Sequence, residues 1–555
     1  MKKNLPVGNS NFNKIIENDL YFVDKSFLIK NIVDSKSEVL LFTRPRRFGK
    51  TLNMNMLKSF FEIENAEKNK KCFQELAISS AGEKYAELQG KYPVIFLSFK
   101  DIKFTNWEDS FYDFKAIIRA ETAKFQYLLT SNSIADFEKN YFSKILSNTA
   151  PDEDYRRFLI SMSSALCRHH GVPAILLIDE YDTPIQQSFQ HGYYDKMIDF
   201  MRVFLGCALK DNSNLYFAAL TGILRVSKES IFSGLNNLKV NTVIDDEYSE
   251  YFGFTQREVD EMAEYYDSAD KLPEIKEWYD GYKFGSLDIY NPWSVLNYFK
   301  HKCKAQPYWV NTSGNEIIID LLKKLSERDI ENLSKLLKGD IVESTIETNT
   351  IYRDIMQNRV SIFSFLLMTG YLKTVGSDNS PRRPLYRLQI PNMEIECVYD
   401  DEIIRYTEQI LENDYFVNIV DEIKNGETAK FRKNLERIIS GCMSFYDSHE
   451  NFYHGFMIGI TALMNKYYIA KSNRESGSGR FDLAFFPRKN NCPPIVMEFK
   501  TCEKPENLIE TASDALRQID TKKYESELSE NSEFETVKYG IAFCGKNISI
   551  TSNID

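Results

Sequence analysis

The sequence predicts an α/β protein in three parts, and three observations along the chain support this prediction. Short apolar runs alternate with helical patterns up to about residue 240, which is typical of a parallel sheet with helices on both faces. The pattern then becomes mainly helical, and strand-like runs return after about residue 400. A chain of 555 residues is also too long for one hydrophobic core. We therefore expect domains at 1–240, 241–400 and 401–555.

Four apolar runs are the predicted strands of the first part. They are SEVLLFTR, YPVIFLSF, PAILLIDE and NLYFAALTG, at residues 37–44, 92–99, 173–180 and 214–222. Helical stretches lie between them, and strands that are joined through helices can pair in parallel. We expect these four strands to form one parallel sheet.

The first of these strands leads into the loop RPRRFGKT and then into a helix. The loop matches the phosphate-binding pattern GxxxxGK[ST] except at its first position, where Arg44 replaces glycine. Lys50 can reach the β- and γ-phosphates of a nucleotide, and Thr51 can hold Mg²⁺. The predicted nucleotide contacts are Arg47, Phe48, Gly49, Lys50 and Thr51.

A second run, AILLIDEYD, supports the nucleotide site because it ends in two carboxylates, Asp179 and Glu180. The aspartate can hold Mg²⁺, and the glutamate can orient or activate the attacking water. The following strand would bring Thr221 near the γ-phosphate, and Arg225 could sense the nucleotide or act as an arginine finger. Alternatively, Arg225 and Lys228 are surface charges. Together these elements predict a P-loop NTPase. We expect ATP rather than GTP, because the chain has no guanine-reading N-K-x-D element.

Composition and charge restrict the class of protein. A net charge of -11 argues against a protein that coats nucleic acid by bulk charge, although it leaves a local basic channel open. The nine cysteines are spread singly, which favours reduced thiols in a cytoplasmic protein. The N-terminal stretch lacks the apolar core of a signal peptide, and no run of about 18 apolar residues predicts a membrane span. We expect no membrane partner.

Local signals predict the elements of the middle part. Thr255 and Glu258 read as a capping box at the start of one helix, and Asn291 with Pro292 marks the start of another. A further helical pattern covers residues 315–337.

The C-terminal part combines helices and strands. Residues 402–440 look helical, and residues 451–468 form a helix that is apolar nearly all round and is therefore expected to be buried. The predicted strands are 480–487, 494–501 and 537–545, with a helix over 507–524.

Two opposite charges, Glu498 and Lys500, lie in the otherwise apolar run PPIVMEFKT. They point to one side of a strand, where buried charge must be paired, hydrogen-bonded or bound to metal. A turn between strands would bring Asp482, sixteen residues before Glu498, beside both. Two carboxylates can bind Mg²⁺ and generate hydroxide near neutral pH, while a lysine can stabilise a pentavalent phosphate. The alternative is a surface cluster of ion pairs.

Other residues could complete this second site. Glu450, at the start of the buried helix, could add a catalytic carboxylate or metal ligand, and we interpret His454 on the same helix face as a core histidine. Downstream, Gln518 and Tyr524 could touch substrate or metal-bound water. The alternative for these two is a helix face that packs on the sheet.

These residues follow the order of the PD-(D/E)XK nuclease superfamily, which the C-terminal part resembles. The segments FVDKSFLIKNI, RPRRFGKTLNMNML, LLIDEYDTPI and LTGILRVSKESIFSGLNNLKV resemble the AAA-ATPase-like family of bacterial proteins, which commonly carries such a nuclease domain at its C-terminus. WYDGYKFG and YNPWSVLNY resemble the middle region of that family. The resemblance implies a P-loop sheet, a mainly helical middle domain and a C-terminal restriction-endonuclease-like fold.

The resemblance also implies two activities and a partner. ATP would be bound and hydrolysed with Mg²⁺ held by Thr51 and Asp179. Phosphodiester cleavage would use Lys500 and Mg²⁺, with Mn²⁺ as an alternative, held by Asp482 and Glu498. The expected partner is nucleic acid, with DNA favoured over RNA. Nuclease domains often pair and related ATPases often form rings, so a homo-oligomer is compatible with the resemblance.

Nucleotide-dependent movement of the middle domain could gate access to the nuclease site. Two other functions stay open: a nucleotide-controlled switch or binding protein with an inactive nuclease fold, and an ATP-driven remodeller of nucleic acid. Cleavage assays test the first alternative. Stimulation of ATP hydrolysis by a nucleic-acid strand tests the second.

Overall fold

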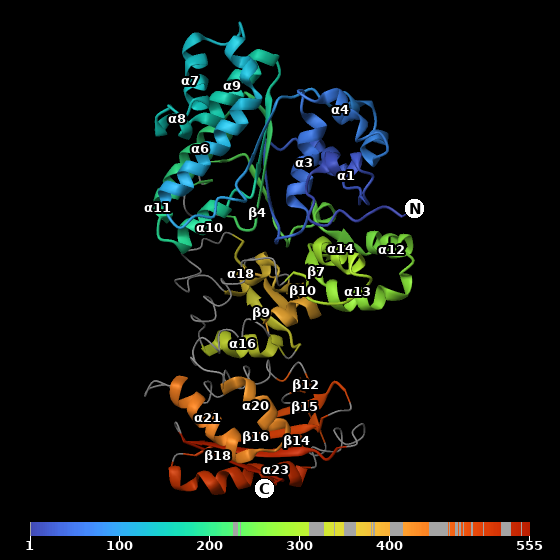
Figure 1. Cartoon of the computed structure of the whole chain (residues 1–555), viewed down its shortest axis with the longest axis vertical. Coiled ribbons are helices and arrows are strands. Elements are labelled where there is room, and N and C mark those ends of the chain that lie inside the picture. Colours follow the sequence, from blue (N-terminus) through green and yellow to red (C-terminus); the bar gives the residue numbers. More distant parts are fainter. Residues whose placement is uncertain are drawn as a thin grey trace. The chain divides into compact units, whose positions relative to one another are not determined.

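The computed structural model divides into two compact units, residues 1–311 with 343–394 and residues 312–342 with 395–555 (Figure 1). The residues that the structure describes are 2–225, 231–232, 235–309, 327–337, 339–348, 362–378, 380, 383–399, 415–442, 464, 467–471, 475–476, 479–480, 482–489, 492–502, 504–522, 534–544 and 547–554.

A parallel five-stranded sheet forms the core of the first unit. Its order is β2-β3-β4-β1-β5, and all its pairings are parallel. The strands are β1 (Val39–Thr43), β2 (Val94–Ser98), β3 (Ala174–Asp179), β4 (Leu215–Gly222) and β5 (Leu238–Asn241). The prediction of a parallel sheet is confirmed, because β1 to β4 fall within the four predicted runs. The sequence does not predict β5, because its four residues, LKVN, contain no apolar run.

Helices cover both faces of this sheet, with α3 and α4 on one side and α6, α9 and α11 on the other (Figure 1). The core beneath them is rich in rings: Phe99 lies 4.5 Å from Phe114 and 6.3 Å from Phe204, between ring centroids. The helices are α1 (Phe12–Glu17), α2 (Phe27–Ser35), α3 (Lys50–Phe61), α4 (Ala66–Lys71), α5 (Glu83–Ala86), α6 (Trp107–Lys124), α7 (Asp136–Leu146), α8 (Asp152–Arg156), α9 (Phe158–His170), α10 (Thr183–Gln190) and α11 (Tyr194–Leu209).

The strand register gathers polar residues at one edge of the sheet. Ser98 lies opposite Asp179 in the pairing of β2 with β3. Phe42, near the end of β1, lies opposite both Thr221 of β4 and Asn241 of β5. Because all five strands run the same way, their carboxyl ends meet where α/β sheets commonly bind ligands.

The middle segment, from the end of β5 to residue 400, contains helices, as predicted, and also two three-stranded sheets that the sequence does not predict. Thr255 and Glu258 form the expected capping box, and Asn291 caps the expected helix through its side chain. The strands escape prediction because none exceeds five residues. The helices are α12 (Gln256–Tyr265), α13 (Leu272–Tyr279), α14 (Pro292–Lys300) and α18 (Ile362–Thr369). The sheets are β6-β8-β7 and β10-β11-β9, from β6 (Phe254–Thr255), β7 (Tyr282–Phe284), β8 (Leu287–Tyr290), β9 (Val342–Thr345), β10 (Lys373–Ser377) and β11 (Leu385–Gln389).

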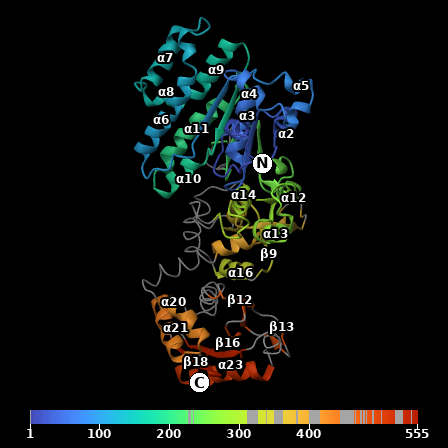
Figure 2. The ribbon, with the colours of Figure 1, turned by 45° about the vertical axis from the view of Figure 1, so that its right-hand side comes forward.

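A mixed five-stranded sheet forms the core of the second unit. Its order is β12-β15-β16-β17-β18, in which β16 and β17 are parallel and the other neighbours antiparallel. Figure 2 shows helices α20 and α21 on one side of this sheet and α23 on the other. The strands are β12 (Tyr468–Lys471), β15 (Leu483–Pro487), β16 (Ile495–Thr501), β17 (Val537–Cys544) and β18 (Asn547–Ser552). The helices are α16 (Glu327–Leu337), α20 (Tyr415–Lys424), α21 (Thr428–Cys442) and α23 (Leu508–Lys522), and a short hairpin joins β13 (Glu475–Ser476) to β14 (Gly479–Arg480).

The predicted elements around the second site are confirmed: β15, β16 and β17 lie within the three predicted strands, and α23 within the predicted helix. One boundary is wrong, because β12 begins at Tyr468, where the sequence predicts the end of a helix. Other predictions lie outside the described residues. These are the helical stretches 315–326 and 402–414, nearly all of 451–467, and the residues Lys228, Glu450, His454 and Tyr524.

Candidate functional site

The loop between β1 and α3 is shaped by two residues in the left-handed conformation. Arg47 has φ +70° and Gly49 has φ +79°. Glycine adopts this conformation freely, whereas for arginine it costs about 1–2 kcal/mol. Gly49 is also the N-cap of α3, so the free N–H groups of a 12-residue helix open towards the loop. Such a helix terminus favours phosphate.

Lys50 is buried within this loop, with 4% of its surface exposed. Its ammonium group donates to the backbone oxygens of Arg44, at 2.8 Å, and Pro45, at 2.7 Å. Burial lowers the pKa of Lys50, and the nearby carboxylates of Glu180 and Asp182 oppose that shift. The ammonium group is thus bound by loop carbonyls that a phosphate could replace.

Asp179, at the end of β3, accepts hydrogen bonds from three hydroxyl groups. Thr51 Oγ1 and Ser98 Oγ donate to its Oδ2 at 2.9 and 3.1 Å, and Thr221 Oγ1 donates to its Oδ1 at 2.8 Å. Burial raises the pKa of Asp179, and the Glu180 carboxylate raises it further. Carboxylate and hydroxyl oxygens are hard donors of the kind that Mg²⁺ prefers. Thr51 and Asp179 therefore fit the predicted magnesium site.

Glu180 adopts a left-handed conformation, with φ +54°, directly after Asp179. Its backbone N–H donates to Thr221 Oγ1 at 3.1 Å, and its Oε2 accepts from Thr183 Oγ1 at 3.2 Å. A strained backbone of this kind persists only where its surroundings hold it, and such positions cluster at functional sites. Glu180 thus has a fixed position next to the oxygen cluster, as a water-orienting group requires.

Asp182 fixes the chain that follows β4. Its buried carboxylate accepts from the backbone N–H groups of Ile223, at 2.8 Å, and Leu224, at 2.9 Å. Arg225 comes directly after this anchored pair and is half-buried. Asp182 is not among the residues predicted from the sequence, although its position three residues after Asp179 in DEYD is a usable signal.

Arg44, which replaces the first glycine of the loop pattern, is fully buried. Its guanidinium donates to the backbone oxygens of Thr43, at 2.9 Å, and Asn241, at 3.0 Å, and to the side-chain oxygen of Asn241. The rings of Phe252 and Phe284 lie 5.1 and 5.2 Å from its guanidinium carbon. Burial lowers the pKa of Arg44 to about 9. This arginine ties the loop to β5 and to the middle segment.

Residues of the middle segment also pack against Arg47 and Phe48, two of the predicted nucleotide contacts in the loop. Phe48 is fully buried, with its ring centroid 4.9 Å from that of Tyr282 and 5.1 Å from that of Phe284. Arg47 is exposed, and its guanidinium carbon lies 4.2 Å from the ring centroid of Trp293. Phe48 can therefore offer only backbone to a nucleotide, whereas Arg47 retains an exposed charge.

In the second unit, β16 faces two environments on its two sides. Met497 belongs to the core that includes α20 and α21, whereas Val496 packs with Ile519 of α23. Glu498 and Lys500 continue the α23 side, because side chains alternate along a strand. Glu498 and Lys500 thus lie on the side of the sheet that α23 covers, next to the small apolar cluster of Ala484, Val496 and Ile519.

Asp482, Glu498 and Gln518 meet on this side. The antiparallel register of β15 and β16 places Asp482 opposite Glu498. The backbone N–H of Asp482 donates to Glu498 Oε2 at 3.4 Å, and Asp482 Oδ2 accepts from the N–H of Phe499 at 2.8 Å. Gln518 Nε2 donates to Glu498 Oε1. Glu498 is 4% exposed, while Lys500, two residues along the same strand, is half-buried.

Gly540 of β17 permits this arrangement by letting α23 approach the sheet. It pairs with Glu498 in the parallel register. A Cβ at this position would collide with the backbone oxygen of Ala512 and the backbone nitrogen of Leu516, both on α23. Gly540 is not among the residues predicted from the sequence, although a glycine inside an apolar strand is a known sign of close backbone approach.

The two carboxylates fit a hard divalent cation. Mg²⁺ is often held by one or two carboxylates together with water. Within the part of the chain that the structure describes, no group of three or more His, Cys, Asp or Glu side chains could hold a metal ion. Glu450, the predicted additional carboxylate, lies outside that part, so Asp482 and Glu498 are the candidate ligands.

Comparison with known proteins bears on both sites. A family model described as "Predicted AAA-ATPase" matches residues 6–232, and one described as "PD-(D/E)XK nuclease superfamily" matches residues 448–553. The chain joins an AAA-ATPase-like domain to a PD-(D/E)XK nuclease superfamily domain. The resemblance inferred from the sequence is therefore confirmed.

The chain is also similar to a curated bacterial protein. This relative is described as an uncharacterized protein in the vnfD 5′ region of Azotobacter chroococcum mcd 1. The two are 28% identical over 412 residues, which cover 73% of this chain and 70% of that protein. The description of the relative assigns it no activity.

The AAA-ATPase-like domain brings most of its predicted residues to one edge of the sheet, where the structure adds Ser98 at the end of β2. A polar residue closing a buried strand is a signal that could have identified Ser98. In the nuclease-superfamily domain, the structure brings the predicted residues Asp482, Glu498 and Gln518 into contact. They can meet because Gly540 lets α23 approach the sheet. Among the described residues, no helix combines the length and the apolar character needed to cross a membrane.

Proposed function

We propose that this protein binds and hydrolyses ATP in its AAA-ATPase-like domain and cleaves nucleic acid, preferably DNA, in its nuclease-superfamily domain. The observation that carries the proposal is the arrangement of Asp482, Glu498 and Lys500 on one side of two paired strands. An oriented Glu498, hydrogen-bonded by Gln518, supports a built site rather than a solvated ion pair.

At the nucleotide site, the N–H groups at the start of α3 and the Lys50 ammonium would bind the phosphates. Thr51 and Asp179 would hold Mg²⁺, which would neutralise phosphate charge when it is bound. Glu180 would orient the attacking water. Thr221 supports this geometry by bonding both the Asp179 carboxylate and the Glu180 backbone.

At the nuclease site, Asp482 and Glu498 would hold a divalent cation, Mg²⁺ or Mn²⁺, which supplies a Lewis acid and an activated water when it is bound. Lys500 would stabilise the negative charge that develops on the phosphate. Gln518 would act on Glu498 as a positioning residue. This division of labour makes Lys500 the most direct residue to test.

Cleavage of plasmid, linear and single-stranded DNA, and of RNA, tests the nuclease activity. Wild-type protein should cut at least one of these substrates with Mg²⁺ or Mn²⁺, and Lys500→Ala should abolish the cutting. Lys504→Ala is the matched control, because Lys504 is an exposed lysine just after the same strand. Absence of cleavage by the wild type under all conditions would refute the nuclease activity. Equal activity of Lys500→Ala and the wild type would refute the role of Lys500.

ATP binding and phosphate release test the other activity independently. Lys50→Ala should lose tight ATP binding, and Asp179→Asn should lose hydrolysis. Lys103→Ala, on an exposed residue shortly after β2, serves as the control. Repeating the cleavage assays with and without ATP tests whether the nucleotide gates the nuclease. An unchanged cleavage rate in Lys50→Ala at every ATP concentration would refute such gating.

A further inference from the structure

Helix α14 connects the phosphate loop with the region where the chain leaves the first unit. Trp293, in the first turn of α14, carries the guanidinium of Arg47 over its ring at 4.2 Å. Its Nε1–H donates to the backbone oxygen of Tyr308 at 3.1 Å. One side chain thus touches both the loop and the segment that ends near residue 311, where the first unit is interrupted.

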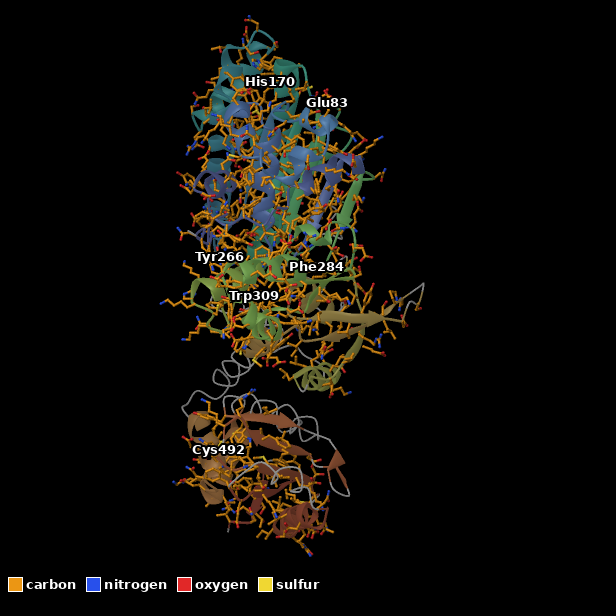
Figure 3. All side chains as sticks on the ribbon, turned by 90° about the vertical axis from the view of Figure 1, so that its right-hand side faces the viewer. Glu83, His170, Tyr266, Phe284, Trp309 and Cys492 are labelled. Atoms are coloured by element: carbon orange, nitrogen blue, oxygen red, sulfur yellow. The ribbon has the colours of Figure 1, made fainter. Side chains whose placement is uncertain are left out.

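The next residue, Ser294, leads to the second place where the chain leaves this unit. Its hydroxyl oxygen lies 2.9 and 2.7 Å from the two carboxylate oxygens of Glu394, the last residue of the unit. Glu394 Oε1 also accepts from the backbone N–H of Trp309 at 2.9 Å. The Glu394 carboxylate therefore links the two segments that lead out of the first unit. Trp309 is labelled in Figure 3, together with Phe284, which packs against Phe48 of the loop.

The contact between Arg47 and Trp293 is one that a nucleotide can break. Arg47 is exposed and lies in the loop that would receive the phosphates. A guanidinium can make bidentate, charge-assisted hydrogen bonds to a phosphate, and these are stronger than an exposed cation–π contact. Bound phosphate would therefore draw the guanidinium away from the ring. The left-handed backbone of Arg47 also gives this residue an unfavourable resting conformation.

We propose that Trp293 is a positioning residue that senses whether the phosphate loop is occupied and transmits this to the Glu394 carboxylate and the two exit segments. The inference rests on the proposed function, because it requires a nucleoside triphosphate in the loop. It makes α14 the element through which the nucleotide regulates the nuclease-superfamily domain. Release of Arg47 changes the packing of Trp293, and Trp293 adjoins the residue that holds Glu394.

Trp293→Leu tests this proposal in the full chain, because it removes the ring but keeps an apolar side chain. The stack competes with phosphate for Arg47, so its loss should tighten ATP binding roughly two- to fivefold. The ratio of cleavage rates with and without ATP should move to one. Trp293→Phe keeps a ring, so its ATP affinity and its ratio of cleavage rates should lie between those of the wild type and Trp293→Leu. Trp278→Leu is the matched control, because Trp278 is also a partly buried tryptophan packed on the same core.

Hydrogen exchange supplies a readout that does not require cleavage. ATP should speed the exchange of wild-type peptides that contain Trp309 or adjoin Glu394, since their shared hydrogen bond weakens. In Trp293→Leu, exchange in these peptides should no longer respond to ATP. If Trp293→Leu fails to fold, Trp293→Phe should show a smaller change in the same direction, and Arg47→Gln, which removes the guanidinium itself, should also leave the exchange of these peptides unresponsive to ATP.

Different outcomes separate this inference from the proposed function. No ATP binding by the wild type would overturn both this inference and the ATPase activity. ATP binding without any cleavage would refute the nuclease activity, and hydrogen exchange would still test the coupling. Unchanged ATP affinity and an unchanged exchange response in folded Trp293→Leu would overturn the role of Trp293.

Discussion

Replacement of Glu394 by glutamine should change how the stability of the first unit depends on pH. Glu394 is fully buried and accepts from Ser294 and Trp309. Burial raises its pKa from 4.5 to about 7, although its hydrogen bonds oppose that shift. Glutamine has the same shape and stays neutral, and its amide can donate to the Ser294 hydroxyl. The substitution therefore removes the titration and keeps the packing.

The size and sign of the effect follow from the two pKa values. Because the folded state holds its proton more tightly, the stability that Glu394 contributes is fully present below pH 4.5 and is lost as the pH rises through about 7. A difference of about 2.5 pKa units corresponds to about 3 kcal/mol. For a unit of roughly 360 residues, unfolding entropy near 0.8 kcal/mol/K converts this into a change of about 4 °C in melting temperature.

Thermal unfolding at several pH values between 5 and 8 measures this change. The melting temperature of Glu394→Gln should rise relative to that of the wild type by about 3 °C over this range, because part of the wild type's loss of stability occurs below pH 5. Glu277→Gln, on an exposed glutamate of α13, should follow the wild type at every pH. If the curves of wild type and Glu394→Gln run parallel, Glu394 ionises as an ordinary carboxyl group and the reasoning fails.

Three further substitutions test the packing around the two sites and a helix cap in the middle segment. Gly540→Ala should push α23 away from Glu498, destabilise the second unit by about 1–3 kcal/mol and reduce cleavage; denaturant unfolding and cleavage rates measure both effects. Asn241→Leu should leave the buried guanidinium of Arg44 short of acceptors and cost about 3 kcal/mol, measured as a fall in the denaturation midpoint of the first unit. Thr255→Ala should cost about 1 kcal/mol by removing the cap of α12, whereas Thr255→Ser should stay close to wild type in the same assay.

Much of the fold is predictable from the sequence because its main strands are buried from end to end. All residues of β1 and β3 are buried, so each appears as a continuous apolar run. The nuclease-superfamily site is predictable for a different reason. The spacing of Asp482 and Glu498 fits two strands and the turn between them, and this short range fixes which residues face each other. The small sheets of the middle segment lack the first signal, because their strands are short and only partly buried.

The contacts of the middle segment with the phosphate loop could not be predicted from the sequence. Arg44 replaces a glycine, but its partner Asn241 is 197 residues away on a strand with no apolar run. Glu394 is one carboxylate in PNMEIECVYD, and its partners Ser294 and Trp309 lie 100 and 85 residues earlier. No periodicity or motif connects residues at such distances. The contacts of Arg44 and Phe48 with Phe284 show that the middle segment packs against the phosphate loop, so a change within that segment should alter the geometry of the loop.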